Sequence, residues 1–203
     1  TVLPAVAANH KTPLLRSHQR PELVASLVGL MSSLVVDYAI RQRGTSLAFF
    51  VVEQAPVLDP AAVQSHCAWL GCPASKWLAD RVVELTYTSF DLEEFSRHCG
   101  GDGAPFRWLP SRRVELQAEM DAAVLHMYGL DREQSEWLID SFTVLRKYEE
   151  TPLEKGGCGE FRTKRLVLEY YDLMTEARRL GVVYESPIAP PPGEGPRHPQ
   201  RSM

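Results

Sequence analysis

Residues 111–129, SRRVELQAEMDAAVLHMYG, predict the longest helix of the chain and with it a mainly helical fold. Apolar residues recur there at intervals of three and four, as on one face of a helix: Leu116, Met120, Ala123 and Met127. Ser111 can cap the first turn, and Gly129 is a typical helix stop. We therefore expect residues 112–128 to be helical and to face a core on one side.

Two further helices are expected downstream. Asp131 and Gln134 form a capping box, which predicts a helix from there to about Phe142. The second helix covers residues 160–180, and its inward-facing residues are Val167, Tyr170, Met174 and Ala177. Residues 149–160, between the two, contain one proline and three glycines and predict a flexible loop. The C-terminal half should therefore pack as a helical, bundle-like unit.

The N-terminal half is expected to combine helices with one strand. An apolar stripe of leucines and Tyr38 over residues 22–40 predicts one helix that ends near Gly44. Residues 47–52, LAFFVV, are apolar, aromatic and β-branched, and predict a short buried strand that Pro56 stops. The predicted fold class is thus mostly α with a small β element near the N-terminus (α+β).

Three more helices are expected before the long one, at residues 59–70, 76–85 and 91–99. Each has a recognisable start in the sequence: Asp59 before Pro60, Ser75, and a capping box of Asp91 and Glu94. The first of them should continue to about Leu70 and end at Gly71.

The pattern divides the 203 residues into three segments. Residues 1–58 hold the first helix and strand, and residues 59–182 form a helical domain. Residues 183–203 contain six prolines and should be an extended or disordered tail. The chain begins with Thr1 rather than methionine, so we expect a processed protein or, as we favour, a piece of a longer one.

The composition excludes several classes of protein. Hydrophobic residues are 44% and charged residues 24%, which are ordinary globular values. There is no run of about 18 apolar residues, which a membrane-spanning helix requires. Four cysteines fit a reducing cytoplasm better than a secreted disulfide scaffold. The net charge of −4 excludes a uniformly basic nucleic-acid coat but allows a local basic patch.

Catalytic and metal-binding motifs are scarce. The sequence has no Gly-x-Ser-x-Gly elbow and no His-Glu-x-x-His helix, and Gly156 to Gly159 follow charged residues rather than a strand. We therefore expect no catalytic residue in this chain. The carboxylates, Glu119 and Asp121 among them, are interpreted as surface charge, and His126 as a packed or surface residue rather than a base.

Histidines and cysteines lie near one another in two places: His66, Cys67 and Cys72, and His98 with Cys99. A zinc site needs four ligands converging in a tetrahedron, and adjacent residues rarely both bind one ion. Free thiols are the favoured interpretation, with zinc as the alternative.

Basic residues gather at the ends of the predicted helices: Arg41 and Arg43, Arg112 and Arg113, Arg146 and Lys147, and Arg162, Lys164 and Arg165. Helix N-termini attract phosphate, so the groups that open a helix are candidates for phosphate contact. Alternatively, these arginines pair with nearby glutamates. Residues 111–180 carry 11 Lys/Arg against 14 Asp/Glu, which favours protein–protein contact over DNA contact there.

Four blocks of the sequence together resemble one family. Residues 33–56, SLVVDYAIRQRGTSLAFFVVEQAP, carry an Asp-Tyr-x-x-Arg signature and a Glu-Gln-x-Pro turn. The other blocks are residues 84–100, 116–131 and 159–171. In this order they resemble segments of large single-chain adenine-specific DNA methyltransferases. These are the type IIG restriction–modification enzymes and related phage-defence methylases, including those of DISARM-type systems.

In that family such blocks lie beyond the catalytic core, in the C-terminal target-recognition region. The core carries a glycine-rich cofactor motif and an (Asn/Asp/Ser)-Pro-Pro-(Tyr/Phe) motif, and this chain has neither. The resemblance therefore implies a non-catalytic part, with residues 1–58 as a partial recognition segment. It implies no cofactor in this chain, and S-adenosylmethionine in the parent enzyme.

The resemblance and the basic clusters together nominate a set of DNA-binding residues: Arg41, Arg43, Gln54, Arg112, Arg113, Arg162, Lys164 and Arg165. Arg41 matches the signature arginine, Arg43 stands where a basic residue is usual, and Gln54 matches the glutamine of the turn. As an alternative, Arg41 holds the fold by satisfying buried carbonyls and Gln54 anchors the turn.

Three functions follow as hypotheses. The first is a DNA-recognition and scaffold part of the methyltransferase, which binds double-stranded DNA. The alternative is a helical docking module that binds the methyltransferase core or another defence-system subunit without touching DNA. The third, a small independent enzyme, has no catalytic residues to support it. We expect a cytoplasmic protein with no membrane contact.

Overall fold

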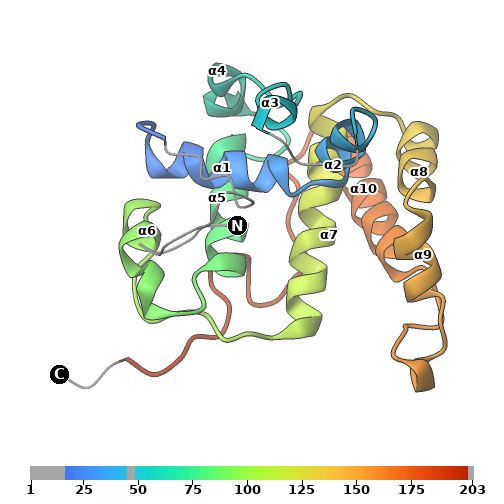
Figure 1. Cartoon of the computed structure of the whole chain (residues 1–203). Coiled ribbons are helices and arrows are strands. Elements are labelled where there is room, and N and C mark those ends of the chain that lie inside the picture. Colours follow the sequence, from blue (N-terminus) through green and yellow to red (C-terminus); the bar gives the residue numbers. More distant parts are fainter. Residues whose placement is uncertain (1–16, 45–48, 201–203) are drawn as a thin grey trace.

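The computed structural model describes residues 17–44 and 49–200, and these are mainly helical (Figure 1). The helices are α1 (Pro21–Met31), α2 (Leu34–Arg41), α3 (Phe49–Val52), α4 (Pro60–Gln64), α5 (Ala74–Thr86), α6 (Glu93–His98), α7 (Pro110–Met127), α8 (Arg132–Asp140), α9 (Thr143–Glu149) and α10 (Arg162–Leu180). Strands β1 (His66–Cys67) and β2 (Cys72–Pro73) form one antiparallel hairpin, and η1 (Phe90–Leu92) and η2 (Leu153–Lys155) are 3-10 turns. The predicted class, mostly α with a small β element, is confirmed.

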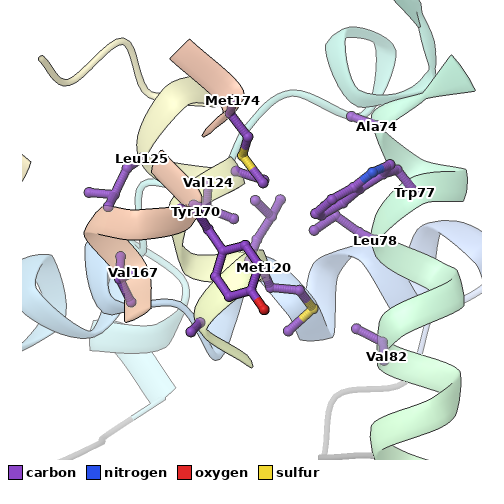
Figure 2. Close-up of a cluster of buried hydrophobic side chains, with 14 of the residues drawn as sticks. Ala74, Trp77, Leu78, Val82, Met120, Val124, Leu125, Val167, Tyr170 and Met174 are labelled. Carbon is purple, nitrogen blue, oxygen red and sulfur yellow. The ribbon is translucent and has the colours of Figure 1, made fainter. Parts of the chain in front are cut away.

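The core lies between α5, α7 and α10. Figure 2 shows Trp77 and Leu78 of α5 facing Met120 of α7, with Tyr170 and Met174 of α10 beside them. α1 crosses α5, and α8 packs on the far side of α10 (Figure 1). The C-terminal helices therefore pack in the bundle-like way that their apolar stripes predict. One buried cluster includes residues of all three expected segments.

The segment after α10 is extended and packed. It runs back along α5 and α7 (Figure 1). The Tyr184 amide donates to the carbonyl of Trp69 at 2.8 Å, and the Tyr184 side chain is buried. Further along, Phe106 and Arg197 form an isolated β-bridge. The described part of this segment, residues 183–200, contains no helix and lies against the helical core.

The predicted helix over residues 22–40 is in fact two helices, bent by 61° at Ser32 and Ser33. The Ser33 hydroxyl caps α2, and Asp121 of α7 accepts a hydrogen bond from the Leu34 amide at 2.8 Å. A distant carboxylate thus starts a second helix inside a continuous apolar stripe, which a local pattern cannot reveal.

The predicted strand over residues 47–52 is wrong where the structure describes it, because Phe49–Val52 form α3; residues 47 and 48 lie outside the described residues. A short apolar run fits a buried helix as well as a strand. The β element is the hairpin of β1 and β2 instead. The hairpin replaces the second half of the helix expected over residues 59–70, because the observed helix α4 ends at Gln64.

Some of the predicted helix caps are present in the structure and others are not. Asp59 caps α4, and Asp131 with Gln134 forms the expected capping box of α8. The hydroxyl of Ser75, expected to cap a helix, donates to Glu22 instead. Helix α7 begins at Pro110 and has no side-chain cap, although Ser111 was expected to supply one. Helix α6 follows η1 and lacks the capping box expected from Asp91 and Glu94. The helix expected to reach Phe142 ends at Asp140, and α9 follows it.

No single helix in residues 17–44 and 49–200 is long and apolar enough to cross a membrane. The bent pair α1 and α2 reaches that length and composition only when taken together.

Candidate functional site

Four of the eight nominated DNA-binding residues are cations that already hold carboxylates of this chain. The pairs are Arg41 with Asp37, Arg112 with Glu84, Lys164 with Glu136 and Asp140, and Arg165 with Glu160 and Glu169. A phosphate would have to displace these carboxylates. The alternative expectation, pairing of arginines with glutamates, describes Arg112 and Arg165, whereas Arg41 pairs with an aspartate. Lys164 pairs with one glutamate and one aspartate.

Arg43 and Gln54 are brought together. Arg43 Nη1 donates to Gln54 Oε1 at 2.7 Å, and both side chains are exposed. In the described part of the chain Arg43 has no ion pair. Arg41, by contrast, lies against Asp37 and over the ring of Phe142, so its contacts are side-chain contacts rather than the buried carbonyls expected as an alternative.

Arg113 and Arg162 line one cavity of about 250 Å³ between α7 and the start of α10. Arg113 Nη1 donates to the carbonyl of Leu85 at 2.7 Å, and its guanidinium stacks on the ring of Trp108. Burial lowers the pKa of Arg113 from its ordinary value. Arg162 Nε is buried and has no hydrogen-bond partner within residues 17–44 and 49–200, which leaves one donor of this cavity unsatisfied there.

Two carboxylates in the same cavity serve the starts of helices. Glu149 accepts from the amide and hydroxyl of Thr163, at 2.8 and 2.7 Å, at the first turn of α10. Asp121 accepts from the Leu34 amide, and burial raises its pKa to about 7. The two carboxylates thus hold the first turns of α10 and α2 in place.

The interpretation of Glu119 and Asp121 as surface charge is wrong, because they are 0% and 3% exposed. Glu119 accepts from Arg81 Nε at 2.7 Å and from the Tyr184 hydroxyl at 2.8 Å. Sequence periodicity places Glu119 on the helix, but its partners come from α5 and from the C-terminal segment. Only the tertiary fold brings this buried pair together.

A second buried ion pair lies at the start of α7. Arg112 of α7 binds Glu84 of α5, and Glu84 Oε2 also accepts from the Gly193 amide at 2.8 Å. Arg112 Nη2 donates to the carbonyl of Pro191 at 3.2 Å. Arg112 thus fastens the C-terminal segment to the core, and its side chain is only 10% exposed, although Nη1 has no hydrogen-bond partner among the described residues.

His126 is a packing residue, as expected. Its ring stacks on Tyr171 with centroids 3.9 Å apart. Arg178 donates to Nδ1 at 2.8 Å, so Nε2 carries the hydrogen and donates to the Tyr171 carbonyl at 3.0 Å. Burial lowers the pKa of His126, and both ring nitrogens are occupied, so it cannot act as a base without breaking these contacts.

The zinc alternative has no support in the described residues. No group of three or more His, Cys, Asp or Glu side chains there could hold a metal ion. The four cysteines are free thiols, of which Cys99 is buried.

Exposed apolar side chains gather on α8, α9 and η2, which we name the outer arm (residues 132–155). They are Trp137, Val144, Tyr148 and Leu153, and each is between 62% and 81% exposed. Figure 1 shows α8 and α9 following one another along the outer edge of the molecule, and the chain from α9 leads to η2. Single exposed apolar residues are ordinary, but several on consecutive elements are typical of an interaction surface.

Helix α9 is more exposed than α8, the other helix of this arm. Within it only Glu149 is buried and Leu145 half-buried. Val144 and Tyr148 are four residues apart, so they share one outward face of the helix. From sequence, Arg146 and Lys147 of this helix stand out as a basic pair, whereas the apolar pair Val144 and Tyr148 was missed although its i, i+4 spacing was a signal.

No family model, no curated protein and no solved structure matches this chain.

Proposed function

We propose that this chain is a helical docking module of an adenine-specific DNA methyltransferase assembly of the restriction–modification or phage-defence kind, and that its outer arm contacts the methyltransferase core. The observation that supports this most is the exposed apolar face of α9, Val144 and Tyr148, on a helix that buries little of itself. The sequence resemblance supplies the identity of the partner.

The charges of the molecule support docking over direct DNA recognition. Most nominated cations face carboxylates of the same chain, and the net charge is −4. A DNA-binding surface needs cations free to replace the counterions of phosphates. The proposed module works in the cytoplasm and supplies no cofactor. S-adenosylmethionine belongs to the partner, and this chain alone should transfer no labelled methyl group to DNA.

A capture experiment tests the docking proposal. The tagged full chain is incubated with lysate of the source cells, and bound proteins are identified by mass spectrometry. We expect a protein with the glycine-rich and (Asn/Asp/Ser)-Pro-Pro-(Tyr/Phe) motifs, which methylates adenine in DNA. The double variant Val144→Asp, Tyr148→Asp should lose it.

The matched control is Leu180→Asp, the same kind of change at an exposed residue of α10. It should retain the methyltransferase. Capture of unrelated proteins only, or equal capture by the outer-arm variant, contradicts the proposal.

DNA contact is the second candidate, and the Arg43–Gln54 pair favours it. The pair is exposed and without a carboxylate partner among the described residues. Arginine and glutamine can both read base edges. If the pair binds DNA, the fluorescence anisotropy of a labelled duplex should rise as protein is added. The affinity should fall steeply as the salt concentration rises, and it should be lower in Arg43→Ala and Gln54→Ala than in wild type. Arg41→Ala is the matched control, because Asp37 already pairs with Arg41.

A further inference from the structure

Cys67 and Cys72 face each other across the hairpin of β1 and β2. They are directly opposite partners in the antiparallel register, next to the pair of His66 and Pro73. Directly opposite residues of antiparallel strands have Cα atoms about 4.5–5.5 Å apart. Disulfides join residues with Cα atoms about 4.4–6.8 Å apart. The backbone register therefore places this pair at a distance that a disulfide can bridge.

The turn holds this register in place. The amides of Leu70 and Gly71 both donate to the carbonyl of Cys67 at 3.0 Å. Gly71 has a φ of +70°, a backbone conformation that glycine adopts readily, so the four-residue turn closes without strain at that position. Both thiols are free and half-buried, which leaves them within reach of a small oxidant.

We propose that Cys67 and Cys72 form a reversible disulfide by exchange with a small-molecule disulfide such as oxidised glutathione. The thiolate of one cysteine attacks a sulfur of glutathione disulfide, forms a mixed disulfide and releases one glutathione thiolate. The thiolate of the other cysteine then attacks the protein sulfur of that mixed disulfide and releases the second glutathione. Two protein thiols become one disulfide, and one glutathione disulfide becomes two glutathione thiols.

The hairpin also holds the C-terminal segment, so its oxidation state has a structural consequence. The carbonyl of Trp69 accepts from the Tyr184 amide at 2.8 Å, and Val183 lies against Gly71 closely enough that a Cβ there would collide with it. Tyr184 in turn reaches the buried Glu119. A disulfide between Cys67 and Cys72 would therefore restrain the turn that contacts Val183 and Tyr184.

Oxygen-free incubation of the full chain with glutathione disulfide, followed by alkylation and tryptic mass spectrometry, tests the proposal. Trypsin cuts after Arg43 and Lys76, so one peptide carries Cys67 and Cys72 and no other cysteine. We expect this peptide to lose the mass of two hydrogens and to escape alkylation until a reductant is added. Cys99, which is buried, should not join the bridge.

Two variants make the test specific. Cys67→Ser should leave Cys72 alkylated or carrying glutathione, and Cys158→Ser, a matched control at another half-buried thiol, should keep the bridge. Two alkylated cysteines in the wild-type peptide, stable glutathione adducts without a bridge, or a bridge to Cys99 or Cys158 would each overturn the proposal.

Hydrogen exchange tests the consequence. The Tyr184 amide should exchange more slowly in the oxidised chain than in the reduced one, because its acceptor is the carbonyl of Trp69 in the bridged turn. Equal exchange in both forms would overturn the link between the bridge and the C-terminal segment.

Discussion

The centre of the molecule and its outer arm are built in opposite ways. At the centre, α5, α7 and the C-terminal segment enclose charged groups whose partners all come from this chain, as with Arg81, Glu119 and Tyr184. The outer arm leaves apolar side chains in solvent, as with Val144 and Tyr148. The centre pairs Glu119 and Glu84 with arginines of the same chain, whereas the arm exposes apolar side chains that we propose a partner covers. The difference points to the arm as the place where a partner binds.

Removing a buried charge from the centre should have the largest effect. Glu119→Ala leaves Arg81 buried without its carboxylate, so we expect the free energy of unfolding to fall by about 3–5 kcal/mol in urea titrations. Glu176→Ala, which removes an exposed partner of Arg179, is the control and should change little. Equal effects of the two substitutions would show that the centre is no more dependent on its charges than the surface.

Asp121 should give the centre a pH dependence. Burial raises its pKa from 3.8 to about 7, so the folded state binds this proton more tightly than the unfolded chain. As the pH rises from about 4 to 7, wild type should therefore lose stability relative to Asp121→Asn, by at most about 1.4 kcal/mol per pH unit. Above pH 7 the difference should stay constant. His126 is present in both proteins, so its contribution cancels in the difference between their free energies of unfolding. Free energies of unfolding that change with pH in parallel in the two proteins would contradict the prediction.

Glu149 links the two regions, because it lies at the end of α9 and holds the start of α10. Glu149→Ala should cost about 1–3 kcal/mol of unfolding free energy, since the Thr163 amide and hydroxyl lose their acceptor. The neighbouring Glu150→Ala removes only an exposed partner of Arg146 and is the matched control. If the free energy of unfolding falls by the same amount in both variants, Glu149 does not anchor the arm.

The smallest effect on stability is expected on the outer face of α9. Val144→Asp with Tyr148→Asp should change the free energy of unfolding by within about 0.5 kcal/mol, because neither side chain is buried. Circular dichroism and urea titration would check this. A large loss would place these residues in the fold of the monomer rather than in a contact with a partner.

The parts of the fold that sequence predicted are those set by local chemistry. Asp59 and Asp131 mark helix starts in the structure, Gly129 follows the end of α7, and the stripes of α7 and α10 face the core. The errors lie where distant contacts decide. Asp121 of α7 caps α2 and so divides the helix that was predicted over residues 22–40. The short apolar run at residues 47–52 is compatible with both a helix and a strand, and its sequence does not distinguish them.

The site was harder to predict for the same reason. Sequence marks Arg112 as a cation at a helix start, but only the fold places Glu84 and the Gly193 amide beside it. The spacing of Cys67 and Cys72 was visible, whereas their opposition across a hairpin was hidden while the segment was predicted to be helical.

Hydrogen–deuterium exchange of the full chain, with and without the methyltransferase recovered by capture, shows which helices the partner covers. The methyltransferase should slow exchange in α9 and η2 and leave exchange in α5 and α7 unchanged. Protection around Arg43 and Gln54 instead, or no protection anywhere, would contradict docking through the outer arm.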